Sequence, residues 1–184
     1  VSVLLNTTVP GANNPSFAAS QEFATGPSPV SLTACDLNGD GKLDLAVTAT
    51  DSNTVSVLLN TTNPGAGTPS FAANQDFGTG AHPQSVANVD LNGDGKLDLV
   101  VANLFSNNLS VLVNTTNPGA TTQSFAAKQD FATGNSPVTV TVCDLNGDGK
   151  FDLVVTNFGS DNVSVLPNIT TPGAAAISVG AKQD

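Results

Sequence analysis

Hydrophobic and polar residues follow a pattern in this chain that returns every 54 residues. The stretch Val55–Asn60 is identical to residues 1–6, and related stretches begin at Leu109 and Val163. No insertion breaks the period, so the 184 residues hold about 3.4 repeats. Self-similarity at a fixed period is the signature of a repeat architecture. The chain is therefore expected to be one array of equivalent units.

Each repeat is expected to contain four short β-strands. In the first complete repeat they are predicted at residues 30–35, 43–49, 55–59 and 71–77. Leucine, valine and alanine at positions 43, 45, 47 and 49 alternate with the residues between them, and this period of two predicts a half-buried strand. Phe71 and Phe77 are six positions apart, so they are expected on one face of the fourth strand. Turn-forming residues separate the strands, and no helical pattern occurs.

Four strands in about 50 residues, repeated without interruption, predict an all-β chain of propeller blades. A solenoid is the alternative, although solenoid coils are usually shorter. The expected units are a half-blade at 1–24 and blades at 25–78, 79–132 and 133–184, which form an open arc or part of a larger propeller. The strand edge near Val1 is then uncovered, and it is expected to meet further repeats of the same chain or neighbouring copies.

An aspartate-rich loop, Asp36–Asp44, lies between the first two predicted strands. Alternate residues of a tight loop direct their oxygens toward one centre, and Gly39 and Gly41 let the backbone curl without a Cβ penalty. Three carboxylates, one amide oxygen and one backbone carbonyl form a set of hard oxygen ligands. Ca²⁺ accepts about 6–8 such ligands, whereas Mg²⁺ demands a stricter octahedron. Zinc is not expected, because no histidine or cysteine lies at ligand spacing.

The same loop occurs three times, with aspartate at its first, fifth and ninth positions in every copy. An EF-hand is excluded because its twelfth position requires glutamate, and that position is Val47, Val101 or Val155 here. A dockerin-type repeat is excluded for the same reason. A hydrophilic turn without metal is the alternative, but it does not explain three copies with identical spacing.

The loop and its flanking strands resemble the calcium loop of FG-GAP and VCBS repeats, which form the blades of integrin-α-like propellers and occur in many secreted bacterial proteins. The resemblance covers essentially the whole chain. It implies one Ca²⁺ per complete repeat, three in all, bound by the side chains at positions one, three, five and nine and by the lysine backbone carbonyl at position seven. The implied ligands are Asp36, Asn38, Asp40, Lys42 and Asp44, then Asp90, Asn92, Asp94, Lys96 and Asp98, and then Asp144, Asn146, Asp148, Lys150 and Asp152.

The charge of the chain also favours a cation as the bound species. The net charge is −10, and nine of the fifteen acidic residues lie in the three loops. Nucleic acid and anionic membranes are not expected partners, because both require a cationic surface. No apolar run approaches the ~20 residues of a membrane span. Tryptophan and tyrosine are absent, which leaves few aromatic platforms for sugar rings.

No arrangement of residues predicts catalysis, so the chain is not expected to be an enzyme. The single histidine, His82, lies in a loop between strands, where a hydrolase triad would need a carboxylate to orient it. Most carboxylates outside the metal loops recur once per repeat, as structural features do. Cys35 and Cys143 share one column of the repeat and are expected to be small buried residues too far apart for a disulfide.

Asn-x-Thr tripeptides begin at Asn6, Asn60, Asn114 and Asn168. They match the acceptor for N-glycosylation. They also lie where a strand is expected to end and a turn to begin, and this second interpretation is favoured.

Together these features predict a non-enzymatic, calcium-stabilised propeller segment of a secreted or cell-surface protein, which serves adhesion or the binding of a protein or glycan ligand. Two alternatives stay open. One is a structural subunit of an extracellular filament, and the other is a carbohydrate-binding accessory part of a secreted enzyme. In the leading reading, Ca²⁺ crosslinks the hairpin between the first two strands of each blade.

Overall fold

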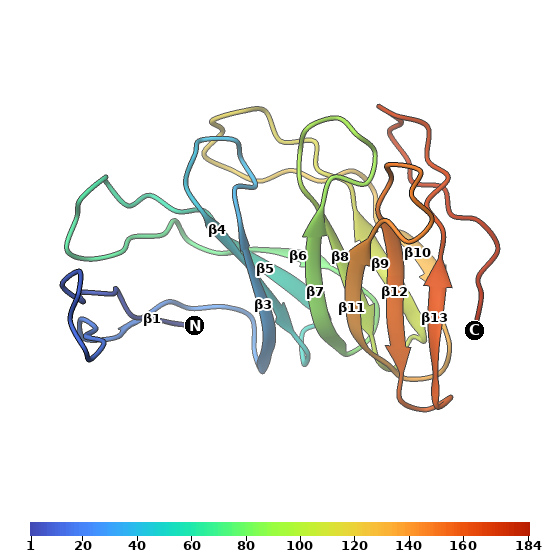
Figure 1. Cartoon of the computed structure of the whole chain (residues 1–184), viewed down its shortest axis with the longest axis horizontal. Helices are drawn as coiled ribbons and strands as arrows, with labels where there is room; N and C mark the ends of the chain where they lie inside the picture. The colour runs from blue at the N-terminus through green and yellow to red at the C-terminus, as the bar shows by residue number, and fades with distance from the viewer.

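The computed structural model describes residues 1–184 and contains thirteen β-strands and no helix. Three large antiparallel sheets stand side by side in chain order, preceded by a small N-terminal hairpin (Figure 1). The hairpin pairs β1 (Ser2–Val3) with β2 (Gln21–Glu22). These observations confirm an all-β chain of repeated units with about four strands each.

Each sheet is an antiparallel meander, and the three sheets are called the first, second and third blades. The first blade contains β3 (Pro29–Cys35), β4 (Asp44–Ala49), β5 (Thr54–Leu58) and β6 (Gln75–Gly78). The second contains β7 (Pro83–Val89), β8 (Asp98–Asn103), β9 (Asn108–Leu112) and β10 (Gln129–Ala132). The third contains β11 (Pro137–Cys143), β12 (Asp152–Asn157) and β13 (Asn162–Leu166). In the third blade an isolated bridge from Val165 to Gln183 takes the place of a fourth strand.

The first strands of the blades lie at the inner edge of the arrangement. β7 packs against both β3 and β11, whereas β3 and β11 make no comparable contact. The outer strands fan away from this edge, and the three blades do not close into a ring (Figure 1). No helix is present that is long and apolar enough to cross a membrane.

The hydrophobic core consists of two layers, one between each pair of neighbouring blades. In β8, Leu99 and Val101 belong to the layer shared with the first blade, while Val100 and Ala102 belong to the layer shared with the third. All four residues are fully buried. A blade between two others therefore has no solvent face, and β8 is hydrophobic on both sides.

The expectation of a half-buried second strand in the first blade is also wrong. In β4 the side chains of Ala46 and Thr48, assigned to the exposed face, are 0 % exposed. Leu43, assigned to the buried face, is 61 % exposed and precedes the strand. Ala46 instead packs in the layer between the first and second blades.

The fourth strand is also shorter than its apolar pattern predicts. Phe71 forms only an isolated bridge with Asn60, and this bridge is displaced by one residue from the register of the β5–β6 ladder. A slip of one residue turns the side chain to the opposite face. Phe77 accordingly packs against Phe125 of the second blade, whereas Phe71 packs against Phe23 of the hairpin, both with ring centroids 4.8 Å apart. The expectation that Phe71 and Phe77 share a face is wrong.

Candidate metal centre

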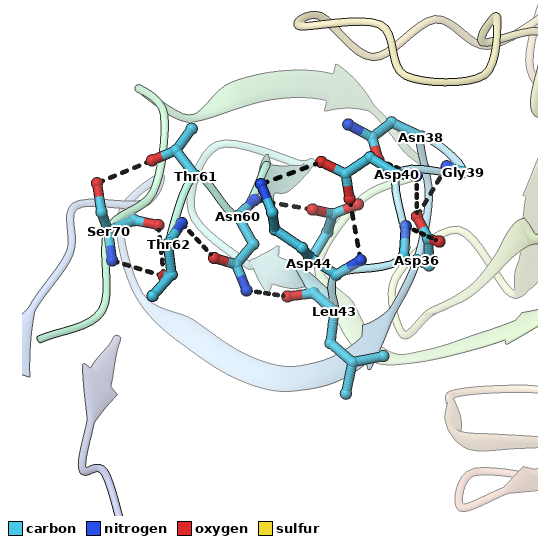
Figure 2. Close-up of polar contacts among 12 residues, drawn as sticks. Asp36, Asn38, Gly39, Asp40, Leu43, Asp44, Asn60, Thr61, Thr62 and Ser70 are labelled. Carbon is cyan, nitrogen blue, oxygen red and sulfur yellow. Dashed lines mark hydrogen bonds and ion pairs between the residues drawn. The ribbon is translucent and has the colours of Figure 1, made fainter. Parts of the chain in front are cut away.

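The three aspartate-rich loops lie at the same end of the blades, where they join β3 to β4, β7 to β8, and β11 to β12 (Figure 1). Each loop contains the five residues expected as ligands, in equivalent positions. Figure 2 shows the first loop, with Asp44 between the turn of Asp36–Asp40 and the backbone of Asn60.

The side chain of Asp36 closes the turn of the first loop. Its Oδ1 accepts hydrogen bonds from the backbone N–H groups of Gly39 at 2.7 Å and Asp40 at 3.1 Å, and its Oδ2 accepts one from Gly41 at 2.8 Å. Gly39 and Gly41 have φ values of 68° and 83°. This left-handed conformation is readily adopted only by glycine, and it directs both amides at the carboxylate.

Two further side chains bend the loop locally. Asn38 Oδ1 accepts from the backbone of Asp40 at 3.2 Å, and Asp40 Oδ1 accepts from the backbone of Lys42 at 3.0 Å. The ammonium of Lys42 lies 3.6 Å from Asp40 Oδ2. The Lys42 carbonyl accepts no hydrogen bond, so its lone pairs are free.

Asp44 is the buried member of the loop and is 0 % exposed. Its Oδ2 accepts from the backbone of Leu37 at 2.9 Å, and its Oδ1 accepts from the backbone of Asn60 at 2.8 Å. The carboxylate thus ties the start of the loop to a residue just beyond the end of the third strand. Burial raises the pKa of Asp44, and repulsion from Asp40 and Asp36 adds to the rise, against the lowering effect of the two hydrogen bonds.

The buried aspartate has the same contacts in the second blade. Asp98 accepts from Leu91 at 3.0 Å and from Asn114 at 2.8 Å. Burial raises the pKa of Asp98 to about 6, with a smaller contribution from the neighbouring carboxylates. Asp152 repeats the pattern in the third blade.

Cys35 does not take part as a ligand. Burial, followed by the charges of Asp44 and Asp36, raises the pKa of the Cys35 thiol to about 12. The thiolate, which is the form that binds metals, is therefore not populated at neutral pH. Cys35 and Cys143 are both free thiols; Cys35 is buried as expected, whereas Cys143 is only partly buried, so the expectation of a buried residue is wrong for Cys143.

The loop residues fit a hard cation by the chemistry of their donors. All the donors are oxygens, which are the ligands of hard cations, and burial raises the pKa of both Asp44 and Asp98. In this structure the carboxylates bond to backbone N–H groups, and no three acidic, histidine or cysteine side chains converge closely enough to hold an ion. The expectation that the oxygens of each loop point toward one centre is therefore not met.

The sequence interpretation missed the asparagines that bind the buried aspartates. Asn60, Asn114 and Asn168 each donate a backbone N–H to an aspartate that lies 16 residues earlier. The feature of the sequence that could have identified these asparagines is the Asn-x-Thr tripeptide, which recurs every 54 residues. Asn114 Nδ2 also donates to the carbonyls of Leu37 and Leu97, and the residue is 1 % exposed. This side chain is therefore not available for glycosylation in the folded chain.

Two family models match this chain. The model described as FG-GAP-like repeat matches residues 36–101 and 90–155, and the model described as FG-GAP repeat matches residues 136–177. The chain belongs to the FG-GAP repeat family. FG-GAP repeats commonly bind Ca²⁺, and the matched segments of this FG-GAP array include all three aspartate-rich loops. No curated protein matches the chain.

Proposed function

We propose that this FG-GAP array is a non-enzymatic, calcium-stabilised segment of a secreted or cell-surface protein, which serves adhesion or ligand binding. The observation that carries the proposal is the loop that recurs three times with a buried aspartate at its end. Asp44, Asp98 and Asp152 each join the start of their loop to the asparagine that lies two residues after the third strand of the blade. A cation at this point would hold together three of the four strands.

In this proposal each loop binds one Ca²⁺ through its side chains at positions one, three, five and nine. The backbone carbonyls of Lys42, Lys96 and Lys150 complete the protein ligands. Asp36 and its equivalents shape the loop, and the buried aspartates anchor it to the sheet. The ion supplies charge compensation, so some of the present N–H contacts would be exchanged for bonds to the metal. Extracellular calcium is abundant enough to saturate even weak sites, since extracellular modules bind with Kd values of about 10⁻⁴–10⁻³ M.

The surroundings of the single histidine support a non-enzymatic role. His82 lies at the start of β7, at the opposite end of the blade from the loop, and its ring stacks on Phe105 with a centroid distance of 4.3 Å. Phe105 is 68 % exposed. This pair resembles a surface contact more than an oriented general base.

Replacement of one loop aspartate tests the proposed sites. Asp40→Ala removes a ligand and leaves Asp36 and Asp44 without an intervening cation, so the variant is expected to bind one Ca²⁺ fewer than the wild type. Native mass spectrometry counts the ions. Asp51→Ala is the matched control, because it removes an acidic residue of the same blade outside the loop, and it should keep every ion. Equal counts in both variants would contradict the proposed ligand set.

A second function, a structural subunit of a filament, is favoured by the two end faces of the array. Leu32 on the outward face of the first blade is 52 % exposed, whereas the equivalent Val86 and Val140 are 7 % and 5 % exposed between blades. On the outward face of the third blade, Val163 is 45 % exposed, whereas the equivalent Val55 and Leu109 are fully buried. The two end faces therefore carry parts of the interface that the chain already uses twice, with the hairpin on part of the first face, where Phe23 packs on Phe71. The occupant that they fit is another blade of the same kind, supplied by further repeats of this chain or by a second copy packed head to tail.

The isolated 184-residue chain is accordingly expected to self-associate through these faces. Leu32→Asp and Val163→Asp should each make the chain monomeric in sedimentation velocity experiments, because each destroys one half of the contact. A mixture of the two variants should form dimers and nothing larger, since each variant keeps one intact face. Ala132→Asp, at an exposed position of β10, is the control and should associate like the wild type. A monomeric wild type would contradict the expectation.

A further inference from the structure

A continuous series of hydrogen bonds joins the first loop to the second through buried groups. The backbone N–H of Leu37 donates to Asp44 at 2.9 Å, and the carbonyl of Leu37 accepts from Asn114 Nδ2 at 2.8 Å. The backbone N–H of Asn114 then donates to Asp98 Oδ1 at 2.8 Å. Asn114 is 1 % exposed, and Asp44 and Asp98 are 0 % exposed. One asparagine therefore bonds to loops on two blades.

The same series continues from the second loop to the third. The backbone N–H of Leu91 donates to Asp98 Oδ2 at 3.0 Å, and the carbonyl of Leu91 accepts from Asn168 Nδ2 at 2.9 Å. The backbone N–H of Asn168 donates to Asp152 Oδ1 at 2.8 Å. The buried aspartates of all three loops are thus connected in chain order.

A second contact holds each of the first two loops against the following blade. The carbonyl of Asn38 accepts from the backbone of Gly119 at 2.6 Å, and Asn38 Nδ2 donates to the carbonyl of Ala120 at 2.9 Å. Asn92 makes the equivalent contacts with Gly173 and Ala174. These contacts cover Asn38 and Asn92, which are 5 % and 3 % exposed.

The third loop has no following blade and lacks these contacts. Asn146 is exposed, and its Nδ2 donates within the loop to Asp148 Oδ2 at 3.2 Å. Leu145, the equivalent of Leu37, is 56 % exposed. The three loops have the same sequence pattern but different surroundings.

We infer that Ca²⁺ binding at neighbouring loops is energetically coupled through Asn114 and Asn168, and that it tightens the contact between blades. The coupling presupposes the calcium binding proposed for the loops. An ion that orders Asp44 and Leu37 also fixes the carbonyl to which Asn114 bonds, and an ordered Asn114 holds Asp98 in place for the next ion. Because each of these buried residues is held by hydrogen bonds on both sides, ordering one loop restricts the position of the next. By linkage, an ion at the second loop strengthens binding at the first by the same factor.

NMR titration with Ca²⁺ can measure the affinity of each loop separately, because Gly41, Gly95 and Gly149 supply one amide signal from each loop. Asp40→Ala disables the first loop. It is expected to weaken Ca²⁺ binding reported by Gly95 about five-fold or more, the lower range of typical coupling. In an Asn114→Ala background, Asp40→Ala should have no effect on the Gly95 signal.

Asn60→Ala is the matched control for Asn114→Ala. Asn60 makes the same contact with its own loop, through Leu43, but has no contact with another blade. The effect of Asp40→Ala on Gly95 should persist in the Asn60→Ala background. Equal Gly95 affinities with and without Asp40 in the wild-type background would overturn the coupling. The absence of Ca²⁺-dependent shifts at all three glycines would instead contradict the proposed calcium binding.

Hydrogen exchange on the unmodified chain gives a second test that does not depend on the folding of any variant. Gly65, Gly119 and Gly173 occupy one column of the repeat, but only Gly119 and Gly173 donate to a loop of the preceding blade. Ca²⁺ is expected to slow the exchange of the Gly119 and Gly173 amides and to leave Gly65 unchanged. Equal slowing at all three, or at none, would overturn the inference.

Discussion

Removal of Ca²⁺ is expected to lower the free energy of unfolding of this chain by about 8 kcal/mol. A ligand at one hundred times its Kd stabilises the folded state by about 2.7 kcal/mol, and three such sites together contribute about 8. The whole stability of an ordinary domain is about 5–15 kcal/mol. The melting temperature should therefore fall steeply, and part of the array should unfold at ambient temperature.

Differential scanning calorimetry with Ca²⁺ and with a calcium chelator measures this effect. Mg²⁺ in place of Ca²⁺ is the control, because Mg²⁺ retains its water and demands a stricter geometry. It should restore little of the lost stability. Superimposable melting curves with Ca²⁺ and with chelator would contradict the stabilising role of the loops.

Leu99→Ala is expected to destabilise the chain by about 2–5 kcal/mol, the cost of truncating a fully buried leucine. Leu99 is 0 % exposed in the layer between the first and second blades. Chemical denaturation in saturating Ca²⁺ measures the loss. This loss of unfolding free energy arises from packing between blades, so it should not depend on bound Ca²⁺.

Leu45→Ala is the matched control, because Leu45 occupies the same column of the repeat in the first blade. Leu45 is only partly buried, since no complete blade precedes it. Its truncation should therefore cost clearly less than that of Leu99. Equal losses would show that burial between blades does not set the stability of this column.

The period of the sequence was sufficient to predict the repeated sheets and the position of the loops. Aspartate at three fixed positions, flanked by apolar residues, requires a tight turn between two strands, and the structure has this turn three times. These features depend on residues that are neighbours in the chain. Local pattern is therefore enough to identify them.

The burial of the strands could not be predicted, because it depends on contacts between repeats. Ala46 and Val100 are buried only because another blade covers them. The reversed orientation of Phe71 depends on a register slip against the partner strand, which no alternation within one strand reveals.

The hydrogen bonds between loops of neighbouring blades could not be predicted either, because they also depend on contacts between repeats. Asn114 and Leu37 are 77 residues apart in the sequence. The Asn-x-Thr tripeptide that begins at Asn114 is also typical of a simple turn at the end of a strand. The period shows which residues are equivalent, but it does not show which equivalent residues touch. The different surroundings of the third loop likewise arise from the packing of blades and not from its sequence.

The number of Ca²⁺ ions bound per chain tests the calcium account most directly. Equilibrium dialysis of the chelator-treated 184-residue chain against Ca²⁺, followed by elemental analysis, measures this number without any substitution. The expected result is three Ca²⁺ per chain, one for each complete loop, retained in the presence of an excess of Mg²⁺. A chain that binds no Ca²⁺, or that exchanges it freely for Mg²⁺, would contradict the account.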